Sequence, residues 1–401
     1  MSLPPPTQRG RHPPPALVDD AMREIFLRVP PDDPASLVRA AAVCKAWRAI
    51  LLSSDDAASF ARDYRAFHGP PPPMLGFLHN KCYKTHCLSH FVSTTATPSF
   101  RPPACHGRRH WYALDSRHGR ALFYTPKSDE DFVVCDPITD DRWAIHADPR
   151  YSDVMWKPQD GDEDEEEKTW NAAVLCAKDR CDHLDCHGGP FLVAFVGSDE
   201  QRGTFASVYS SETDQWSKVI FLNQPNAIME AGHSAVLGSK VYFPCKQSTQ
   251  IVEFNMGEHK LAVINKPFNQ AYLALVGVED GMLLFAGLRE SKLHLLSMEA
   301  GPNGAVAWVR CRIIALKPLL PSRALLKASV VGFAEGIGAI FLSTEAGLFK
   351  IELNSGRSRK IYRKMFFEKI MPYTSFYTGV RNVGGCSGRA SGAGVTATTA
   401  M

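Results

Sequence analysis

The chain changes its hydrophobic pattern once, near residue 70, and this change divides it into a helical part and a strand-rich part. Over residues 17–52 the apolar side chains recur three or four positions apart, which is the spacing of one face of an α-helix. From residue 75 onward apolar and polar positions alternate in short segments broken by turns, as in β-strands. The sequence therefore predicts a small α-helical domain followed by a larger all-β domain.

Three short helices are predicted within residues 17–52. Their apolar faces are formed by Met22, Ile25, Phe26 and Val29, by Leu37, Ala41 and Cys44, and by Cys44, Trp47, Ile50 and Leu51. Pro30 and Pro31 end the first helix, and Asp33 before Pro34 is predicted to cap the second. A fourth helix is predicted over residues 53–69 from the spacing of Ala58, Phe60, Ala61, Tyr64 and Phe67. A helical segment of about 40 residues rarely folds alone, so its surplus of apolar residues predicts a binding partner.

The order of residues in this segment resembles the F-box of plant F-box proteins. The residues that carry the resemblance are Leu17, Asp20, Glu24, Ile25, Arg28, Pro30, Leu37, Val43, Cys44, Lys45, Trp47 and Arg48. The resemblance implies that the segment binds a Skp-type adaptor, which attaches the protein to a cullin scaffold so that a captured target is ubiquitinated. The adaptor contacts that it implies are Leu17, Ile25, Pro30, Val43, Cys44 and Trp47.

Two positions depart from the family pattern. Val18 stands where the family usually has a proline, and Ala21 replaces a larger aliphatic residue. Each change is expected to weaken adaptor binding, by on the order of 1 kcal/mol, because it removes rigidity or buried area. Two alternatives follow: an F-box that no longer assembles a ligase, or a helical cap with no external partner.

A run of four prolines, Pro70 to Pro73, follows the helices and favours an extended spacer. The predicted organisation is a disordered tail at 1–15, the F-box and the following helix at 16–68, a linker at 69–74, the β domain at 75–380, and a disordered tail rich in Gly, Ser and Thr at 381–401.

Within residues 75–380 a unit of two strands and a polar turn recurs. The turns that mark it are 74, 45, 42 and 57 residues apart and start at Asp136, Ser210, Asn255, Ser297 and Asn354. Propeller blades usually span about 40 to 50 residues, so the period predicts a β-propeller of about six or seven blades. Residues 75–105 and 365–380 are expected to form a composite closing blade. A two-layer β-sandwich is the alternative fold.

Two segments of this domain, GHSAVLGSKVYFPC and VGFAEGIGAIFLSTEAGLFKIEL, are similar to the kelch-like, F-box-associated β-propeller. That second resemblance implies that the β domain recruits the target protein. Together the two resemblances imply a non-catalytic substrate receptor of a Skp-cullin-F-box ubiquitin ligase. Neither the target nor the loops that bind it follow from the sequence.

An insertion is predicted near residues 157–190, and it carries an acidic run and a cluster of cysteines and histidines. The acidic run at 160–167 is typical of a solvated loop. The cluster consists of Cys176, Cys181, His183, Cys186 and His187. Thiols and imidazoles at short spacing can bind zinc, but no second well-spaced pair lies nearby, so an ordinary polar loop is favoured and no metal site is predicted. The same reading applies to a weaker group, His79, Cys82, His86, Cys87 and His90.

Composition narrows the function classes further. The chain has 401 residues, of which 45% are hydrophobic and 22% charged, and a net charge of +3. A strong basic excess, which would indicate a nucleic acid or membrane-surface partner, is missing, and so is any apolar run long enough to span a membrane. Eleven scattered cysteines fit a reducing compartment, so the cytoplasm or nucleus is expected. No convincing catalytic set appears, and a hydrolase or zinc enzyme that uses the Cys/His loop is a minor alternative.

Overall fold

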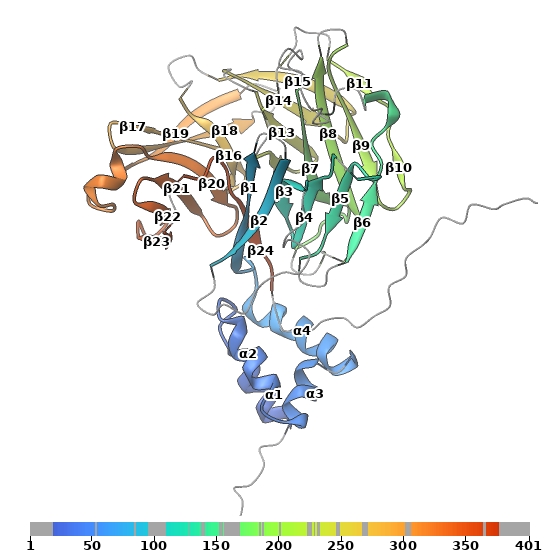
Figure 1. Ribbon diagram of the computed structural model, residues 1–401, viewed down its shortest axis with the longest axis vertical. Coiled ribbons are helices and arrows are strands. Elements are labelled where there is room, and N and C mark those ends of the chain that lie inside the picture. The colour runs from blue at the N-terminus through green and yellow to red at the C-terminus, as the bar shows by residue number, and fades with distance from the viewer. Residues whose placement is uncertain are drawn as a thin grey trace, which may run out of the picture.

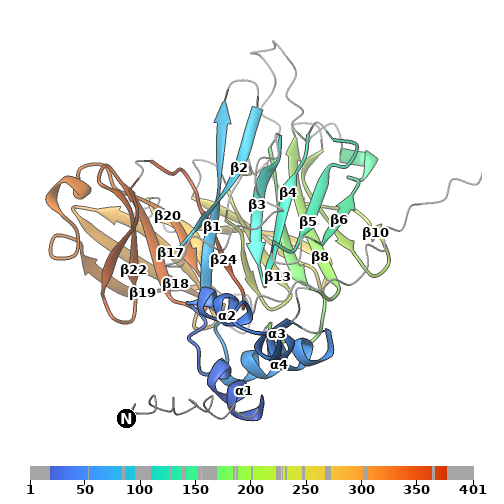
Figure 2. The ribbon, with the colours of Figure 1, turned by 60° about the horizontal axis from the view of Figure 1, so that its bottom comes forward.

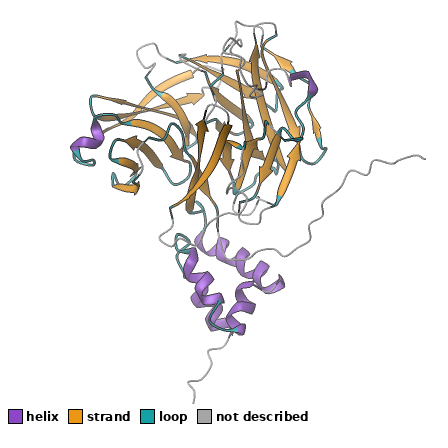
Figure 3. Ribbon diagram, viewed as in Figure 1, coloured by secondary structure: helices purple, strands orange, loops and turns teal. Residues whose placement is uncertain are grey.

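The computed structural model describes residues 19–376, apart from residue 53 and shorter or longer gaps at 84–85, 95–109, 127, 138–140, 152–154, 156–168, 184–185, 187, 200–201, 223–226, 228, 231–232, 246–248, 267–271, 301–305 and 364–365. A small helical unit lies against one end of a much larger array of strands (Figures 1 and 3). The two predicted tails, Leu17, Val18 and the acidic run lie outside the described residues.

The helical unit contains four helices: α1 (Asp19–Leu27), α2 (Pro34–Ala41), α3 (Lys45–Leu52) and α4 (Ser54–His68). Its core is formed by Met22, Phe26, Leu37, Ala41, Ile50, Leu51, Phe60, Tyr64 and Phe376. Most of the predicted apolar faces are therefore confirmed. Ile25, Cys44 and Phe67 are exposed and do not belong to this core, so the faces are narrower than the spacing predicted.

Asp33 occupies the position before α2, as predicted, but it does not cap the helix with its side chain. Its carboxylate instead accepts a hydrogen bond of 2.6 Å from the hydroxyl of Ser36. The backbone carbonyl of Asp33 accepts the N–H of Ser36 at 3.2 Å and closes the first turn. Pro34 at the start of the helix has no N–H that would need a partner.

Among the described residues the strands form six antiparallel sheets. Five of these sheets are each made of strands that follow one another in the chain. The first contains β3 (Tyr112–Arg117), β4 (Arg120–Tyr124), β5 (Phe132–Cys135) and β6 (Arg142–Ile145), and the second contains β7 (Thr169–Cys176), β8 (Phe191–Asp199), β9 (Gly203–Ser210), β10 (Gln215–Trp216) and β11 (Ile220–Phe221). The other three contain β12 (Ala235–Leu237), β13 (Lys240–Pro244), β14 (Gln250–Asn255) and β15 (Lys260–Asn265); β16 (Ala274–Glu279), β17 (Met282–Arg289), β18 (Lys292–Ala300) and β19 (Val306–Ala315); and β20 (Ser329–Ala334), β21 (Ala339–Thr344), β22 (Gly347–Glu352) and β23 (Ser358–Tyr362). Short 3₁₀ turns lie at Pro149–Tyr151 and Ser322–Leu325.

The sixth sheet joins the two ends of the array. It contains β1 (Met74–Tyr83), β2 (His86–Ser93) and β24 (Met371–Thr374), in the order β2-β1-β24. The register places Leu78 opposite Met371 and Met74 opposite Thr374. This closing sheet completes a six-bladed β-propeller, so the predicted composite blade is present and the sandwich alternative is wrong. Figure 2 shows the β1–β2 hairpin extending away from the helices.

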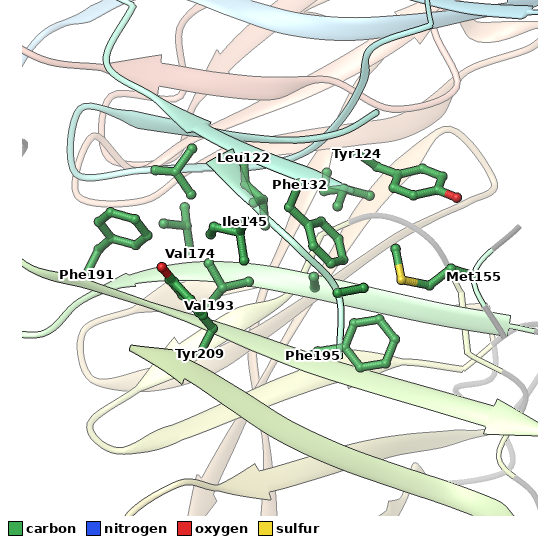
Figure 4. Packing of buried hydrophobic residues seen from close by; sticks show 14 of the residues in the cluster. Leu122, Tyr124, Phe132, Ile145, Met155, Val174, Phe191, Val193, Phe195 and Tyr209 are labelled. Carbon is green, nitrogen blue, oxygen red and sulfur yellow. The ribbon is translucent and has the colours of Figure 1, made fainter. Parts of the chain in front are cut away.

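An apolar cluster fills the space between each pair of neighbouring sheets. Many strands therefore consist of consecutive apolar residues. Every residue of β4, β5 and β21 is buried. Figure 4 shows the cluster between the β3–β6 and β7–β10 sheets, where Leu122 and Phe132 face Val174 and Phe195. Because each sheet is covered on both faces, strict alternation of apolar and polar residues is not required.

The insertion predicted over 157–190 is shorter than the sequence indicated. Residues 169–176, which were assigned to it, form β7, the inner strand of its sheet. The Cys/His segment is the loop that joins β7 to β8. The strand was missed because it follows the acidic run directly, with no turn signal of the repeating type. Within the described residues, no helix has the length and apolar character needed to cross a membrane.

Candidate functional site

The helical unit presents apolar side chains to solvent. Ile25 on α1 is 49% exposed, and Val43 in the turn between α2 and α3 is 63% exposed. Pro30 and Cys44 are exposed as well. Four of the six residues predicted to contact an adaptor are therefore accessible.

Trp47 and Leu17 differ from these four. Trp47 on α3 is half-buried, and its ring packs edge-on against Phe26 of α1, with 5.4 Å between the ring centroids. It therefore stabilises the packing of α1 on α3 as well as presenting an edge to solvent. Leu17 lies outside the described residues.

Helix α4 is bonded to α1 and to the turn that follows it. Arg23 of α1 donates to Asp63 at 2.6 Å and to Ser59 at 2.9 Å, both on α4. The hydroxyl of Tyr64 donates to the carbonyl of Val29 at 2.7 Å, and burial raises the pKa of Tyr64 well above its ordinary value. The short F-box-like helices are thus held in place by a helix that also leads into the proline linker.

The helical unit is attached to the propeller at the closing sheet. Phe376, just after β24, is buried in the helical core, and its ring lies 6.2 Å from that of Tyr64. The N–H of Ser375 donates to the carbonyl of Pro73 at 3.1 Å. The chain therefore enters and leaves the propeller side by side, at the point where the helices sit (Figure 1).

A buried charged network lies on the propeller axis. Arg117, at the end of β3, is bonded to Asp115 at 3.1 Å and to Glu335 at 2.9 Å, and it also donates to the carbonyl of Ser234. Burial raises the pKa of both carboxyl groups, whereas the neighbouring guanidinium lowers it. Asp115 accepts the N–H of Val174 at 3.0 Å, so the network joins inner strands of several sheets.

The end of the axis that faces the helices forms a cavity of about 230 Å³. Its wall includes the linker prolines Pro70 to Pro72, the network residues, and three histidines, His118, His183 and His233. The Nε2–H of His233 donates to the carbonyl oxygen of Val331 at 3.2 Å. The linker prolines therefore cover part of this opening.

Four of the five cysteines and histidines of the β7–β8 cluster come together in space. The potential ligand atoms of Cys176, Cys181, His183 and Cys186 all lie within 4.8 Å of one another. His187 lies outside the described residues. In the weaker group, His79 and His90 stack at 5.4 Å across β1 and β2, while the side chains of 82–87 lie outside the described part. The sequence analysis named this cluster but favoured an ordinary polar loop, because spacing alone could not show that the four side chains meet.

A comparison with protein-family models assigns the helical segment. The F-box domain model matches residues 15–56. These residues form an F-box domain. The F-box covers α1, α2 and α3 and the beginning of α4. F-box domains bind Skp-type adaptors and generally belong to non-catalytic adaptor subunits, which agrees with the exposed aliphatic residues of this one.

Comparisons with whole proteins add little to the F-box assignment. No curated protein sequence matches the chain. Among solved structures, a chain of the mitotic checkpoint complex shares 9% identity at a TM-score of 0.32, and the match covers 61% of each chain. Virginiamycin B lyase from Staphylococcus aureus shares 9% identity at a TM-score of 0.35, with 71% of this chain and 83% of that one covered. A streptogramin B lyase shares 11% identity at a TM-score of 0.31, and the match covers 64% of this chain and 83% of that one.

Proposed function

We propose that the protein is the substrate-recognition subunit of a Skp-cullin-F-box ubiquitin ligase. The observation that carries the proposal is an F-box domain, with Ile25 and Val43 exposed, joined to a closed propeller. The F-box would hold a Skp-type adaptor and, through it, a cullin scaffold. The propeller would hold a target protein for ubiquitin-dependent degradation. We place the protein with the plant F-box proteins that carry a kelch-like propeller, in the cytoplasm or nucleus.

The subunit performs no chemistry in this proposal. It holds a lysine of the target near the charged ubiquitin carrier and so raises the effective concentration of the two reactants. A fixed distance between adaptor and target favours this role. The packing of Phe376 on Tyr64 and the bond between Ser375 and Pro73 limit rotation of the F-box against the propeller.

The target is expected on the propeller face that points away from the F-box. The inner strands run toward the helices, because β24 ends beside Pro73. The segments before the inner strands therefore lie on the far face. Two exposed aromatic residues belong to these segments: Tyr272, 39% exposed, precedes β16, and Phe366, 57% exposed, precedes β24. Exposed aromatic side chains often anchor protein partners.

The adaptor interaction can be tested by co-purification with a plant Skp-type adaptor. Ile25→Asp combined with Val43→Asp should lower adaptor affinity at least tenfold, or about 1.4 kcal/mol, because each carboxylate loses water on binding. Leu326→Asp is the matched control: Leu326 is 74% exposed but lies on the propeller, so adaptor binding should be unchanged. Full adaptor binding by the doubly changed F-box would contradict the contact assignment.

The rival is an F-box that no longer assembles a ligase, and the departures at Val18 and Ala21 motivate it. Failure of the unmodified chain to bind any Skp-type adaptor, while its propeller remains folded by circular dichroism, would favour this rival. If the adaptor binds, the doubly changed protein also serves as a trap: it should retain targets that the unmodified protein sends to degradation.

A further inference from the structure

We propose that Cys176, Cys181, His183 and Cys186 bind a structural zinc ion that fixes the loop between β7 and β8. Cys176 is the last residue of β7, and the other three lie in the loop that leads to β8 at Phe191. The cluster is separate from the F-box surface and from the far face of the propeller. The inference concerns the scaffold and is independent of what the propeller binds.

The positions of the side chains fit one tetrahedral ion. All four ligand atoms lie within 4.8 Å of one another, and Cys186 Sγ lies 3.6 Å from His183 Nδ1. Zinc binds thiolate sulfur at about 2.3 Å and imidazole nitrogen at about 2.0 to 2.1 Å, which puts the two atoms about 3.6 Å apart in a tetrahedral site. That pair already has the required separation, and the other pairs of ligand atoms lie no more than 4.8 Å apart.

The loop is built tightly around the cluster. The N–H of Lys178 points at Cys176 Sγ at 3.4 Å, an arrangement that favours a thiolate. The N–H of Gly189 donates to the carbonyl of Cys186 at 2.9 Å and closes the turn after the last ligand. His183 has a positive φ of 57°, which is unfavourable for a residue other than glycine. A bond from His183 to a metal ion gives a reason for this conformation to be held.

A buried positive charge beside the cluster provides an independent argument. Arg120, 1% exposed, is bonded to the carbonyl oxygens of Cys186 and Gly189, and its Nη1 lies 3.9 Å from Cys186 Sγ. Among the described residues, no carboxylate forms an ion pair with it. A zinc ion with three thiolates and a neutral imidazole carries one net negative charge. The occupied site would therefore supply the counter-charge that a buried guanidinium requires.

The ligand set indicates which ion is bound and what it does. Thiolate and imidazole ligands favour zinc over calcium and magnesium, which prefer oxygen. All four positions are taken by the protein, so no place is left for water or a substrate, and the site is structural. The ring of His183 stacks on that of His118 at 3.7 Å, and both line the cavity beside the linker prolines. The ion would thus fix one wall of the propeller end that faces the F-box.

The metal content of the purified full-length chain tests the proposal. Elemental analysis should find one zinc ion per chain. Replacement of zinc by cobalt should give the visible absorption of a tetrahedral, thiolate-bound Co²⁺ ion. Cys181→Ser should reduce the bound zinc several-fold or abolish it, whereas Cys245→Ser, at a buried cysteine of another sheet, should leave it unchanged.

Two results would overturn the proposal. One is a folded chain, with its thiols reduced, that contains almost no zinc and gives no tetrahedral cobalt spectrum. The other is a Cys181→Ser protein that keeps its full zinc content. If this variant does not fold, the zinc content and cobalt spectrum of the unmodified chain decide the question, and Arg120→Gln should still lower zinc affinity about 10- to 100-fold.

Discussion

The helical unit and the propeller differ in how their hydrophobic cores are completed. The propeller sheets are covered on both faces, and whole strands such as β4 and β21 are buried. The F-box leaves Ile25 and Val43 in solvent and completes its own core with Phe376, a residue supplied by the other domain. The hydrophobic cores of the propeller are formed by its own residues, whereas the core of the helical unit includes a residue from outside it. The packing of the helical unit therefore depends on a residue from outside it, whereas the cores between the propeller sheets do not.

Loss of the charge on the propeller axis should have the largest effect on stability. Arg117→Met would leave the buried Asp115 and the partly exposed Glu335 without their cation. Because Glu335 keeps contact with solvent, the loss should lie near the lower end of the roughly 3 to 5 kcal/mol that a broken buried ion pair costs. Denaturant unfolding of the propeller measures this cost. Arg28→Met is the control, because Arg28 forms an exposed ion pair with Glu24 on α1 and should change the free energy of unfolding by less than about 1 kcal/mol. Equal losses in both variants would contradict the distinction between the two regions.

Removal of the Phe376 ring should destabilise the helical unit and leave the propeller unaffected. Phe376→Ala is expected to destabilise the helical unit by about 3 kcal/mol, because it empties a packed site against Tyr64. Hydrogen exchange should accelerate in α4 and remain slow in β21. Faster exchange in β21 than in α4 would show that the ring supports the propeller instead.

Acidification should weaken the propeller through His233. Burial lowers the pKa of His233 to about 4 in the folded protein, and Lys369 and Arg117 lower it further, although the carbonyl of Val331 acts the other way. The unfolded chain therefore takes up a proton first as the pH falls below 6.5. Stability should drop by up to about 1.4 kcal/mol per pH unit between pH 6.5 and 4.

Unfolding curves of His233→Asn as a function of pH isolate this contribution. The variant should lose the part of the slope between pH 6.5 and 4 that belongs to this histidine. His259→Asn, at an exposed turn of the β12–β15 sheet, should keep it. Identical pH profiles for His233→Asn and the unmodified protein would exclude His233 as the source.

The smallest effect on stability is expected at the F-box surface. Val43→Asp should change the free energy of unfolding by no more than about 0.5 kcal/mol, since the side chain is exposed and packs in no core. The same change should still weaken adaptor binding. Thermal unfolding of the isolated chain, measured beside the binding assay, separates the two outcomes; a large loss of stability would place Val43 in the core.

The sequence predicted local features well and the contacts between distant segments poorly. Helical spacing identified Met22 and Phe26 as core residues, and the strand-turn period identified the propeller. The spacing could not tell that Ile25 would stay exposed, because α1 packs through only one narrow face. The site residues taken from the F-box resemblance remain predictions.

Contacts between residues far apart in the chain could not be predicted from the sequence, because they depend on how the strands are arranged in space. Arg117 and Glu335 are 218 positions apart and meet only because the sheets form a circle. Cys176 approaches the loop cysteines because β7 pairs antiparallel with β8, which places Cys176 opposite Phe191. The sequence grouped Cys176 with the loop residues, but it assigned 169–176 to an insertion and so did not show that a strand end holds Cys176 in place.

The closing sheet has a kinetic consequence. The ring is shut by noncovalent pairing of β24 with β1, so its opening requires β24 to leave. Because Phe376 follows β24 and is held in the helical core, the helices act as a latch on that strand. A partner that binds and stabilises the helices would slow release of the latch. Binding of a partner to the helical unit would then lengthen the lifetime of the closed propeller.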